Sequence, residues 1–133
     1  MPTFRITIVR ATRPKKPELN EDLQWLCNSL GLFSLRDRDK SMFRIFVELL
    51  KGARQKAPLT SDQLAYRTEL SRGTVVHHIN KLIEAGLVVS DKNTYLLRVH
   101  NLEYLIDELE RDLDRALIDM RAIARRIDQE LGL

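Results

Sequence analysis

Residues 71–88, SRGTVVHHINKLIEAGLV, combine several side chains whose types and spacing could do chemistry. Hydroxyl, guanidinium, imidazole, amide and ammonium groups alternate with regularly spaced aliphatic residues, and the helical pattern ends at Gly86. Three uses of these groups can be compared: binding of a metal ion, catalysis, and recognition of a surface outside the protein.

The adjacent histidines His77 and His78 are the first candidates for a metal site. Neighbouring side chains on a helix point about 100° apart, whereas a chelating pair needs a spacing of three or four residues. His100 lies much further along the chain, and Cys27 is the only cysteine. The sequence therefore predicts no metal site and no cofactor.

Catalytic motifs are also missing from the sequence. It contains no glycine-rich phosphate loop, no HExxH motif and no Ser-His-Asp order. The simplest interpretation of Cys27 is a buried apolar residue of a helix. We therefore expect a protein that is not an enzyme.

A helix over residues 71–85 would separate its side chains into two faces. The apolar face, expected to pack on a core, consists of Val75, Ile79, Leu82 and Ile83. The opposite face is small and polar and consists of Gly73, Thr74, His77, Asn80, Lys81 and Glu84. Such a face suits the DNA major groove, where base edges present donors and acceptors. A merely solvated face is the alternative, and His78, at the flank, is expected to have a structural role.

Composition predicts a soluble globular protein of one domain. The chain has 133 residues, of which 44% are hydrophobic and 31% charged. It has no apolar run long enough for a membrane span and no signal-peptide pattern, so we expect a cytoplasmic protein. Residues 1–60 carry 12 Lys and Arg against 6 Asp and Glu, whereas residues 101–133 carry 5 against 9. A basic front half permits a polyanionic partner.

The sequence of the first 51 residues predicts a strand, a linker and two helices. Alternating apolar residues over 4–9 indicate a short half-buried strand, followed by a basic, proline-bracketed linker. Asn20 is the expected cap of a helix that ends near Gly31. A second helix is expected from about Leu35 and ends at Gly52. Its expected core face consists of Phe43, Phe46, Val47 and Leu50.

Two capped helix starts lie in the middle of the chain. Thr60 and Gln63 have the spacing of a capping box, and Ser71 is the cap of the helix that ends at Gly86. A two-turn helix, a tight turn and a second helix form the layout of a helix-turn-helix motif. The β-rich runs around residues 91–93 then predict a β-hairpin.

The last helix is expected to begin after its cap, Asn101, and to reach Leu131. Its apolar positions alternate by four and three residues over nearly four heptads. At 1.5 Å per residue it would be roughly 45 Å long, more than so small a domain can cover. Pairing with a second copy is expected, with packing in the same chain as the alternative. The expected dimerisation residues are Leu102, Ile106, Leu109, Leu113, Met120, Ile123 and Ile127.

The segment LTSDQLAYRTELSRGTVVHHINKLIEAGLVVS, residues 59–90, resembles the winged helix-turn-helix of prokaryotic transcription regulators of the ArsR/MarR-like group, most closely archaeal ones. The shared pattern is a cap, a Thr-Val pair, a histidine, a leucine and EAGLV. The resemblance covers about residues 34–133 and implies a homodimer that places two helices in successive major grooves of double-stranded DNA. Because the cysteine pairs of metal-sensing members are absent, metal sensing is not implied.

Carried over by position, the resemblance implies DNA contacts from the second helix and from the hairpin tip. The implied contact residues are Ser71, Arg72, Gly73, Thr74, His77, Asn80, Lys81, Lys92 and Asn93. The hairpin, residues 88–98, would reach the DNA backbone or the minor groove.

The predicted fold is mostly α with a small β-hairpin wing (α+β). It is a winged helix-turn-helix with a long C-terminal dimerisation helix and a short N-terminal strand. We expect a strand and basic linker over 1–18, the winged domain over 19–100 and a coiled-coil-like helix over 101–133. The predicted function is a homodimeric, sequence-specific DNA-binding transcription regulator. The alternative is a winged-helix module that binds proteins without sequence-specific DNA binding.

Overall fold

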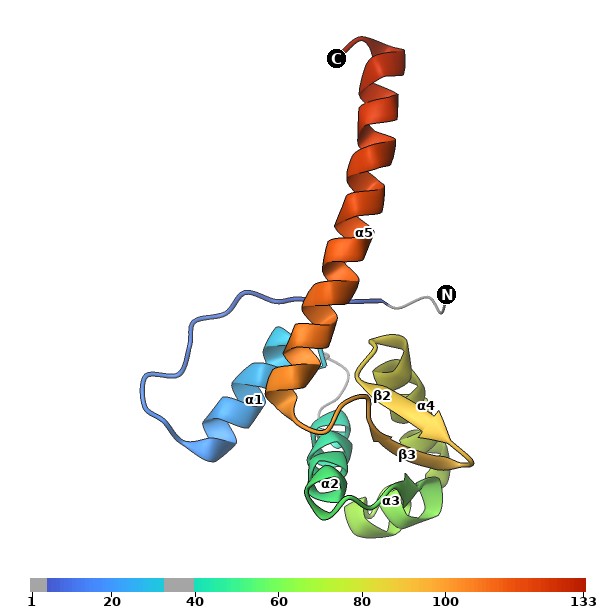
Figure 1. Ribbon diagram of the computed structural model, residues 1–133. Coiled ribbons are helices and arrows are strands. Elements are labelled where there is room, and N and C mark those ends of the chain that lie inside the picture. Colours follow the sequence, from blue (N-terminus) through green and yellow to red (C-terminus); the bar gives the residue numbers. More distant parts are fainter. Residues whose placement is uncertain (1–4, 33–39) are drawn as a thin grey trace.

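The computed structural model describes residues 5–32 and 40–133. Helices α1 to α4 and a small sheet lie together at one end of the molecule, and the C-terminal part of α5 projects away from them (Figure 1). In chain order, the elements within these ranges are α1 (Leu19–Ser29), α2 (Ser41–Gln55), β1 (Leu59–Thr60), α3 (Ser61–Thr68), α4 (Arg72–Glu84), β2 (Val88–Asp91), β3 (Thr94–Leu97) and α5 (Leu102–Leu131).

The segment ahead of α1 forms no strand in its described part. Residues 5–10 lie outside the sheet. Two backbone hydrogen bonds hold them instead: the Arg5 N–H donates to the Glu84 carbonyl oxygen and the Val9 N–H to the Ser29 carbonyl oxygen, each over 2.8 Å. The predicted strand is wrong for these residues, because alternating apolar side chains do not by themselves supply a partner strand.

Helix α1 has a different cap from the one expected. The Glu18 carboxylate accepts hydrogen bonds from the Asn20 N–H over 3.2 Å and the Glu21 N–H over 2.9 Å. Glu18, rather than Asn20, therefore caps the helix, and its negative charge interacts favourably with the helix dipole.

Helix α2 ends later than predicted. Its expected start near Leu35 lies outside the described residues, and the helix is described from Ser41 to Gln55. Gly52 is buried within it, and a Cβ atom added there would lie 2.9 Å from the Ala57 carbonyl oxygen. Gly52 therefore permits close packing against the loop after the helix and does not terminate it.

The core face of α2 is also only partly as predicted. Phe46 is fully buried, whereas Phe43, Val47 and Leu50 are half-buried. The other buried apolar side chains are Met42, Ile45 and Leu49. Apolar residues occur around most of this helix, so periodicity alone did not select the face that packs.

The two predicted caps of the helix-turn-helix are confirmed. The Thr60 hydroxyl accepts from the Gln63 N–H over 3.0 Å, and the Gln63 side-chain oxygen accepts from the Thr60 N–H over 2.8 Å. The Ser71 hydroxyl accepts from the Thr74 N–H over 3.1 Å. Glu69, with φ of 59°, adopts the left-handed conformation that ends α3 and lets the chain turn into α4.

The sheet is antiparallel, with the order β1-β3-β2. Strands β2 and β3 form the predicted hairpin, here called the wing. Its two turn residues, Lys92 (φ 50°) and Asn93 (φ 65°), are both left-handed, as in a type I′ turn. Strand β1 adds Leu59 opposite Tyr95. This strand was not predicted, because two residues are too few to show a period.

The core lies between α1, α2, α3, α4, the sheet and the first turns of α5. Among the described residues, the apolar side chains with no exposed surface are Cys27, Ile45, Phe46, Leu64, Val75, Ile79, Leu82 and Leu105. Full burial of one such aliphatic or aromatic side chain stabilises a fold by about 1.5–3 kcal/mol. The fold is thus mostly α with a small sheet, a winged helix-turn-helix followed by a long helix, as predicted. None of the helices in the described ranges is long and apolar enough to cross a membrane.

Candidate nucleic-acid interface

Helix α4 is held in place by its apolar side. Three of the four residues that the sequence assigned to the core, Val75, Ile79 and Leu82, are buried. The fourth, Ile83, is half-buried. At its C-terminal end, the Gly86 N–H donates to the Ile83 carbonyl oxygen and the Leu87 N–H to the Leu82 carbonyl oxygen, each over 3.0 Å. With Gly86 at φ of 77°, this is a Schellman ending, so both ends of α4 are closed by specific hydrogen bonds.

The opposite side of α4 is polar and accessible. The exposed members of the predicted contact set at and on α4 are Ser71, Arg72, Gly73, His77, Asn80 and Lys81, and Thr74 is half-buried. A Cβ atom added to Gly73 would meet no atom of the described chain within 4 Å. The Ser71 hydroxyl donates to the Thr74 hydroxyl over 2.8 Å, so these two side chains are ordered against each other. The backbone at Gly73 can therefore be approached closely from outside.

The wing lies beside α4. Strand β2 packs against α4, and the wing tip extends past it (Figure 1). Lys92 and Asn93 are both exposed at the tip. The structure therefore places all nine predicted contact residues on α4, its cap and the wing tip.

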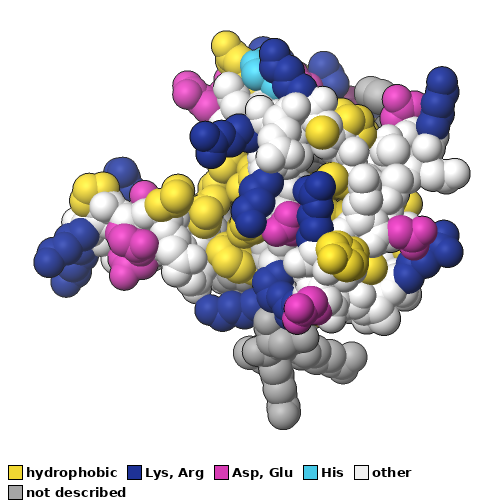
Figure 2. Space-filling model, turned by 90° about the horizontal axis from the view of Figure 1, so that it is seen from below, with side chains coloured by type: hydrophobic (Ala, Val, Ile, Leu, Met, Phe, Trp, Pro, Cys, Tyr) yellow, Lys and Arg dark blue, Asp and Glu magenta, His cyan; other side chains and the backbone are white. Residues whose placement is uncertain are grey.

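Two positively charged side chains beside α4 are paired with acidic ones. Arg72 Nε lies 3.6 Å from Asp62 Oδ1, and Arg5 Nε lies 3.6 Å from Glu84 Oε1. These pairs are largely exposed, so they are weak and sensitive to salt. Figure 2 shows the face of the molecule away from the free end of α5, where Lys and Arg side chains are spread widely with fewer acidic side chains between them.

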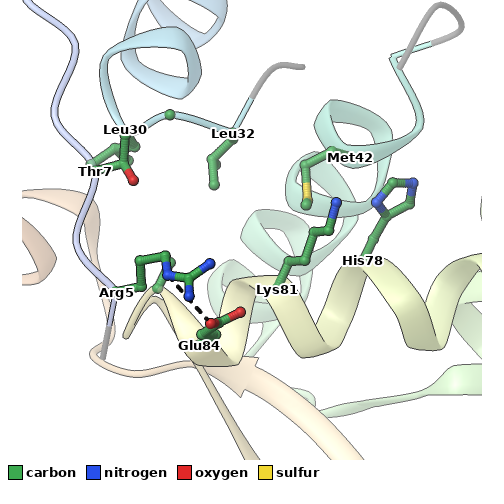
Figure 3. A pocket seen from close by; sticks show the side chains of 10 residues that line it. Arg5, Thr7, Leu30, Leu32, Met42, His78, Lys81 and Glu84 are labelled. Atoms are coloured by element: carbon green, nitrogen blue, oxygen red, sulfur yellow. Dashed lines mark ion pairs between the residues drawn. The ribbon is translucent and has the colours of Figure 1, made fainter. Parts of the chain in front are cut away.

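A cavity of about 190 Å³ opens beside the C-terminal half of α4. Lys81 and His78 extend from α4 toward Met42 of α2, and Leu30 and Leu32 lie on the far side of the cavity (Figure 3). His78 is half-buried there, at the flank where the sequence placed it. Lys81 therefore shares one side of α4 with His78, at the edge of the predicted DNA-facing surface.

The histidines and the cysteine are the side chains in which other chemistry was considered. The His77 and His78 ring centroids lie 5.5 Å apart with the rings tilted by 54°. In the part of the chain that the structure describes, no group of three His, Cys, Asp or Glu side chains could hold a metal ion. Burial raises the pKa of the Cys27 thiol to about 12, so the thiol is protonated at neutral pH and unreactive.

Comparison with protein families identifies the middle of the chain. Residues 39–91 match the family model of a helix-turn-helix domain. This segment is therefore similar to a helix-turn-helix domain. It contains α2, β1, α3, α4 and β2 but spans less than half of the chain. Neither a curated protein nor a solved structure matches the chain. In DNA-binding domains of this type the second helix of the motif enters the major groove, and its counterpart here is α4.

Sequence reasoning missed two arginines that join separate elements: Arg44 joins α2 to the end of α3, and Arg98 joins the end of the wing to α5. The Arg44 guanidinium donates to the Thr68 carbonyl oxygen at the end of α3. The Arg98 guanidinium donates to both carboxylate oxygens of Asp112 and, over 3.2 Å, to Glu108 Oε2. The hydrogen bond from Arg98 lowers the pKa of the Asp112 carboxyl. The partners in each pair are far apart in the sequence, so no local sequence pattern predicts their contact.

The predicted dimerisation residues of α5 divide into two groups. Leu109 is buried and belongs to the hydrophobic core, and Leu102 and Leu113 are half-buried. Leu109 is therefore a core residue rather than part of a dimer seam, because its own domain already covers it. The remaining residues are 41–64% exposed; they are Ile106, Met120, Ile123 and Ile127.

Proposed function

We propose that this protein is a homodimeric, sequence-specific DNA-binding transcription regulator. The observation that carries the proposal is the exposed polar side of α4, the second helix of a helix-turn-helix domain. An α-helix is about 10–12 Å wide with its side chains, and the DNA major groove is about 12 Å wide. Because the buried side of α4 is fixed in the core, its polar side can enter the groove as a rigid surface.

The base contacts are assigned to the middle of this surface. The Asn80 amide carries a donor and an acceptor in one plane, which matches the edge of adenine. His77 and Thr74 offer further donors and acceptors within the same groove. Gly73 has no side chain to separate the helix from the DNA, so the start of α4 can lie deep in the groove.

The phosphate contacts are assigned to the edges of the surface. Arg72 and Lys81 carry positive charge at opposite ends of the α4 face. The first backbone N–H groups of α4, beside Ser71, favour an anion through the helix dipole. Lys92 and Asn93 would reach the backbone or the minor groove from the wing tip. Phosphate contacts position the protein, while base contacts select the sequence.

A second copy of this chain is the proposed partner of α5. Beyond Leu113 every residue of α5 is exposed, yet the apolar residues continue at spacings of four and three. Those that a partner helix would cover are Ala116, Met120, Ile123 and Ile127. A two-stranded coiled coil would remove this stripe from water. The resulting symmetry would place two α4 helices on half-sites about 34 Å apart along the DNA.

The proposal also covers the family resemblance of the chain, its division into segments and its location in the cell. The resemblance of residues 59–90 to ArsR/MarR-like regulators, archaeal ones in particular, supports a role in transcription. The proposed division is an N-terminal segment over 1–18, a winged domain over 19–100 and a dimerisation helix over 101–133. The proposed location is the cytoplasm, where the DNA of a prokaryotic cell lies.

The test is binding of the full chain to DNA. Fluorescence anisotropy would be measured on duplexes that tile the region upstream of its own gene, at salt concentrations from about 50 to 200 mM, a range over which phosphate contacts strongly change affinity. We expect one duplex to bind about a thousandfold or more tightly than the others, as specific sites do. His77→Ala/Asn80→Ala is the matched variant and should lose this preference while it keeps non-specific binding.

Uniformly weak binding that changes little with salt would contradict the proposal. It would favour instead the winged-helix module that binds proteins through the exposed apolar residues of α5.

A further inference from the structure

Residues 5–9, here called the strap, are fixed against the end of α4. The Arg5 N–H donates to the Glu84 carbonyl oxygen over 2.8 Å, and the Val9 N–H donates to the Ser29 carbonyl oxygen over 2.8 Å. One end of the strap is thus bonded to the last residue of α4 and the other to the last residue of α1. The strap consequently borders the cavity beside α4 (Figure 3).

The position of the strap depends on a glycine after α1. Gly31 has φ of 70°, and a Cβ atom added to it would lie 2.6 Å from Thr7 Cγ2. Only a residue without a side chain allows Thr7 to lie this close. The strap is therefore packed into the fold between its two backbone anchors, and Arg5 has a defined place beside α4.

Arg5 changes the charge at this end of α4. Glu84 is the only acidic residue of the helix and lies on its predicted DNA-facing side, where it would repel phosphate. Arg5 Nε lies 3.6 Å from Glu84 Oε1, and the Arg5 side chain is 79% exposed. An exposed ion pair adds little to folding stability. Its main effect is therefore to offset the Glu84 charge at the surface.

The Arg5 guanidinium also has N–H groups beyond the one that faces Glu84. A guanidinium carries five N–H donors, and its fork matches carboxylate and phosphate oxygens alike. With one side toward Glu84, an exposed Arg5 can still donate to an anion approaching α4 from outside. If α4 lies in the major groove, the backbone phosphates of the DNA strand at its edge are such anions.

We propose that the strap forms the outer edge of the DNA-binding surface and that Arg5 binds a backbone phosphate of duplex DNA. This inference rests on the proposed function. It adds a contact from a segment that lies outside the helix-turn-helix domain of residues 39–91. Base selection remains with α4, since Arg5 lies at its end.

The experiment compares four full-length variants with the wild type by fluorescence anisotropy on one duplex across a salt series. They are Arg5→Ala, Glu84→Gln, the double variant Arg5→Ala/Glu84→Gln and the control Arg10→Ala. Arg10 is exposed and lies just past the Val9 anchor, so its loss removes an equal charge from the same segment. Unchanged thermal melting would show that each variant is folded.

We expect Arg5→Ala to weaken binding several-fold and to reduce the salt slope by about 0.9, the value for one phosphate contact. The same loss should appear in the Glu84→Gln background, and Arg10→Ala should cause a smaller one. If Arg5→Ala has no effect once Glu84 is neutral, Arg5 only screens Glu84, and the phosphate contact is excluded. An equal effect of Arg10→Ala would also overturn the inference. Absence of binding by the wild type would instead refute the proposed function itself.

Discussion

Arg98 and Asp112 form a two-point ion pair between the end of the wing and α5. The Arg98 guanidinium donates to Asp112 Oδ2 and, over 3.2 Å, to Asp112 Oδ1. Their side chains are 18% and 10% exposed, so the pair is better shielded than the surface pairs near α4. Arg98 directly follows β3, and Asp112 lies on α5 three residues, just under one helical turn, after the buried Leu109. The pair therefore holds α5 at a fixed angle to the wing, and in the proposed dimer it would set the spacing of the two α4 helices.

Asp112→Asn should destabilise the fold, because it removes the charge from a shielded hydrogen-bonded pair and leaves Arg98 with a weaker partner. We expect a loss of about 1.5–3 kcal/mol in the free energy of unfolding, the usual range for a hydrogen bond to a charged group. Urea denaturation would measure it. Asp114→Asn, at an exposed position of the same helix, is the control and should change stability little. Equal stability of the two variants would contradict the structural role of the pair.

The same pair makes stability depend on pH. Arg98 lowers the pKa of Asp112 in the folded protein below that of an unfolded chain. The native state therefore favours the ionised carboxylate, and this stabilisation is present above the ordinary Asp pKa of about 3.9. It is lost as the pH falls from that value through the lower folded-state pKa. Thermal melts from neutral to acidic pH should show a smaller acid-dependent loss for Asp112→Asn than for the wild type.

Two glycines should respond oppositely to replacement by alanine. Gly52→Ala would place a Cβ atom 2.9 Å from the Ala57 carbonyl oxygen, and we expect this overpacking to cost about 1–3 kcal/mol. Gly73→Ala meets open space in a helix and should stabilise the fold by up to about 1 kcal/mol. Under the proposed function, Gly73→Ala should nevertheless weaken DNA binding, because its methyl group faces the groove. Melting curves together with anisotropy would separate the two effects.

Base and phosphate contacts should be separable at Asn80 and Lys92. Asn80→Ala is expected to reduce discrimination between the specific duplex and a mismatched one by about 1–3 kcal/mol. Lys92→Ala should weaken binding to all duplexes about equally and reduce the salt slope by about 0.9. Both comparisons use anisotropy on matched and mismatched duplexes. If neither substitution changes binding, the assigned surface is wrong.

The exposed part of α5 should control the oligomeric state. Met120→Glu/Ile123→Glu would place two charges in the apolar stripe, and we expect monomers in sedimentation equilibrium where the wild type is a dimer. Arg125→Glu is the control: two residues after Ile123 it lies about 200° around the helix, away from the stripe. Leu109 is unsuitable for this test, because its replacement would damage the domain core. A wild-type monomer would remove the basis for the homodimer.

The middle of the chain was predictable because its signals are local. The caps at Thr60 and Ser71, the glycine ending at Gly86 and the period of α4 involve residues within a few positions of one another. Hydrogen bonds that close a helix depend on this short range, so the sequence alone determined the helix-turn-helix and the two sides of α4. The wing followed from its two β-rich runs and the turn residue Asn93.

Other features depend on what each residue meets in space. Alternation over residues 4–9 suggested a strand, but only the fold shows that residues 5–9 lie against the ends of α1 and α4. The pairing of Arg98 with Asp112 and the close packing at Gly52 likewise join parts that no sequence period relates. For α5, the heptad spacing determined a long amphipathic helix. Only the tertiary structure decided that Leu109 packs in its own domain while Met120 and Ile127 stay exposed. The reason is that burial depends on where the domain ends, and the spacing of apolar residues carries no information about that position.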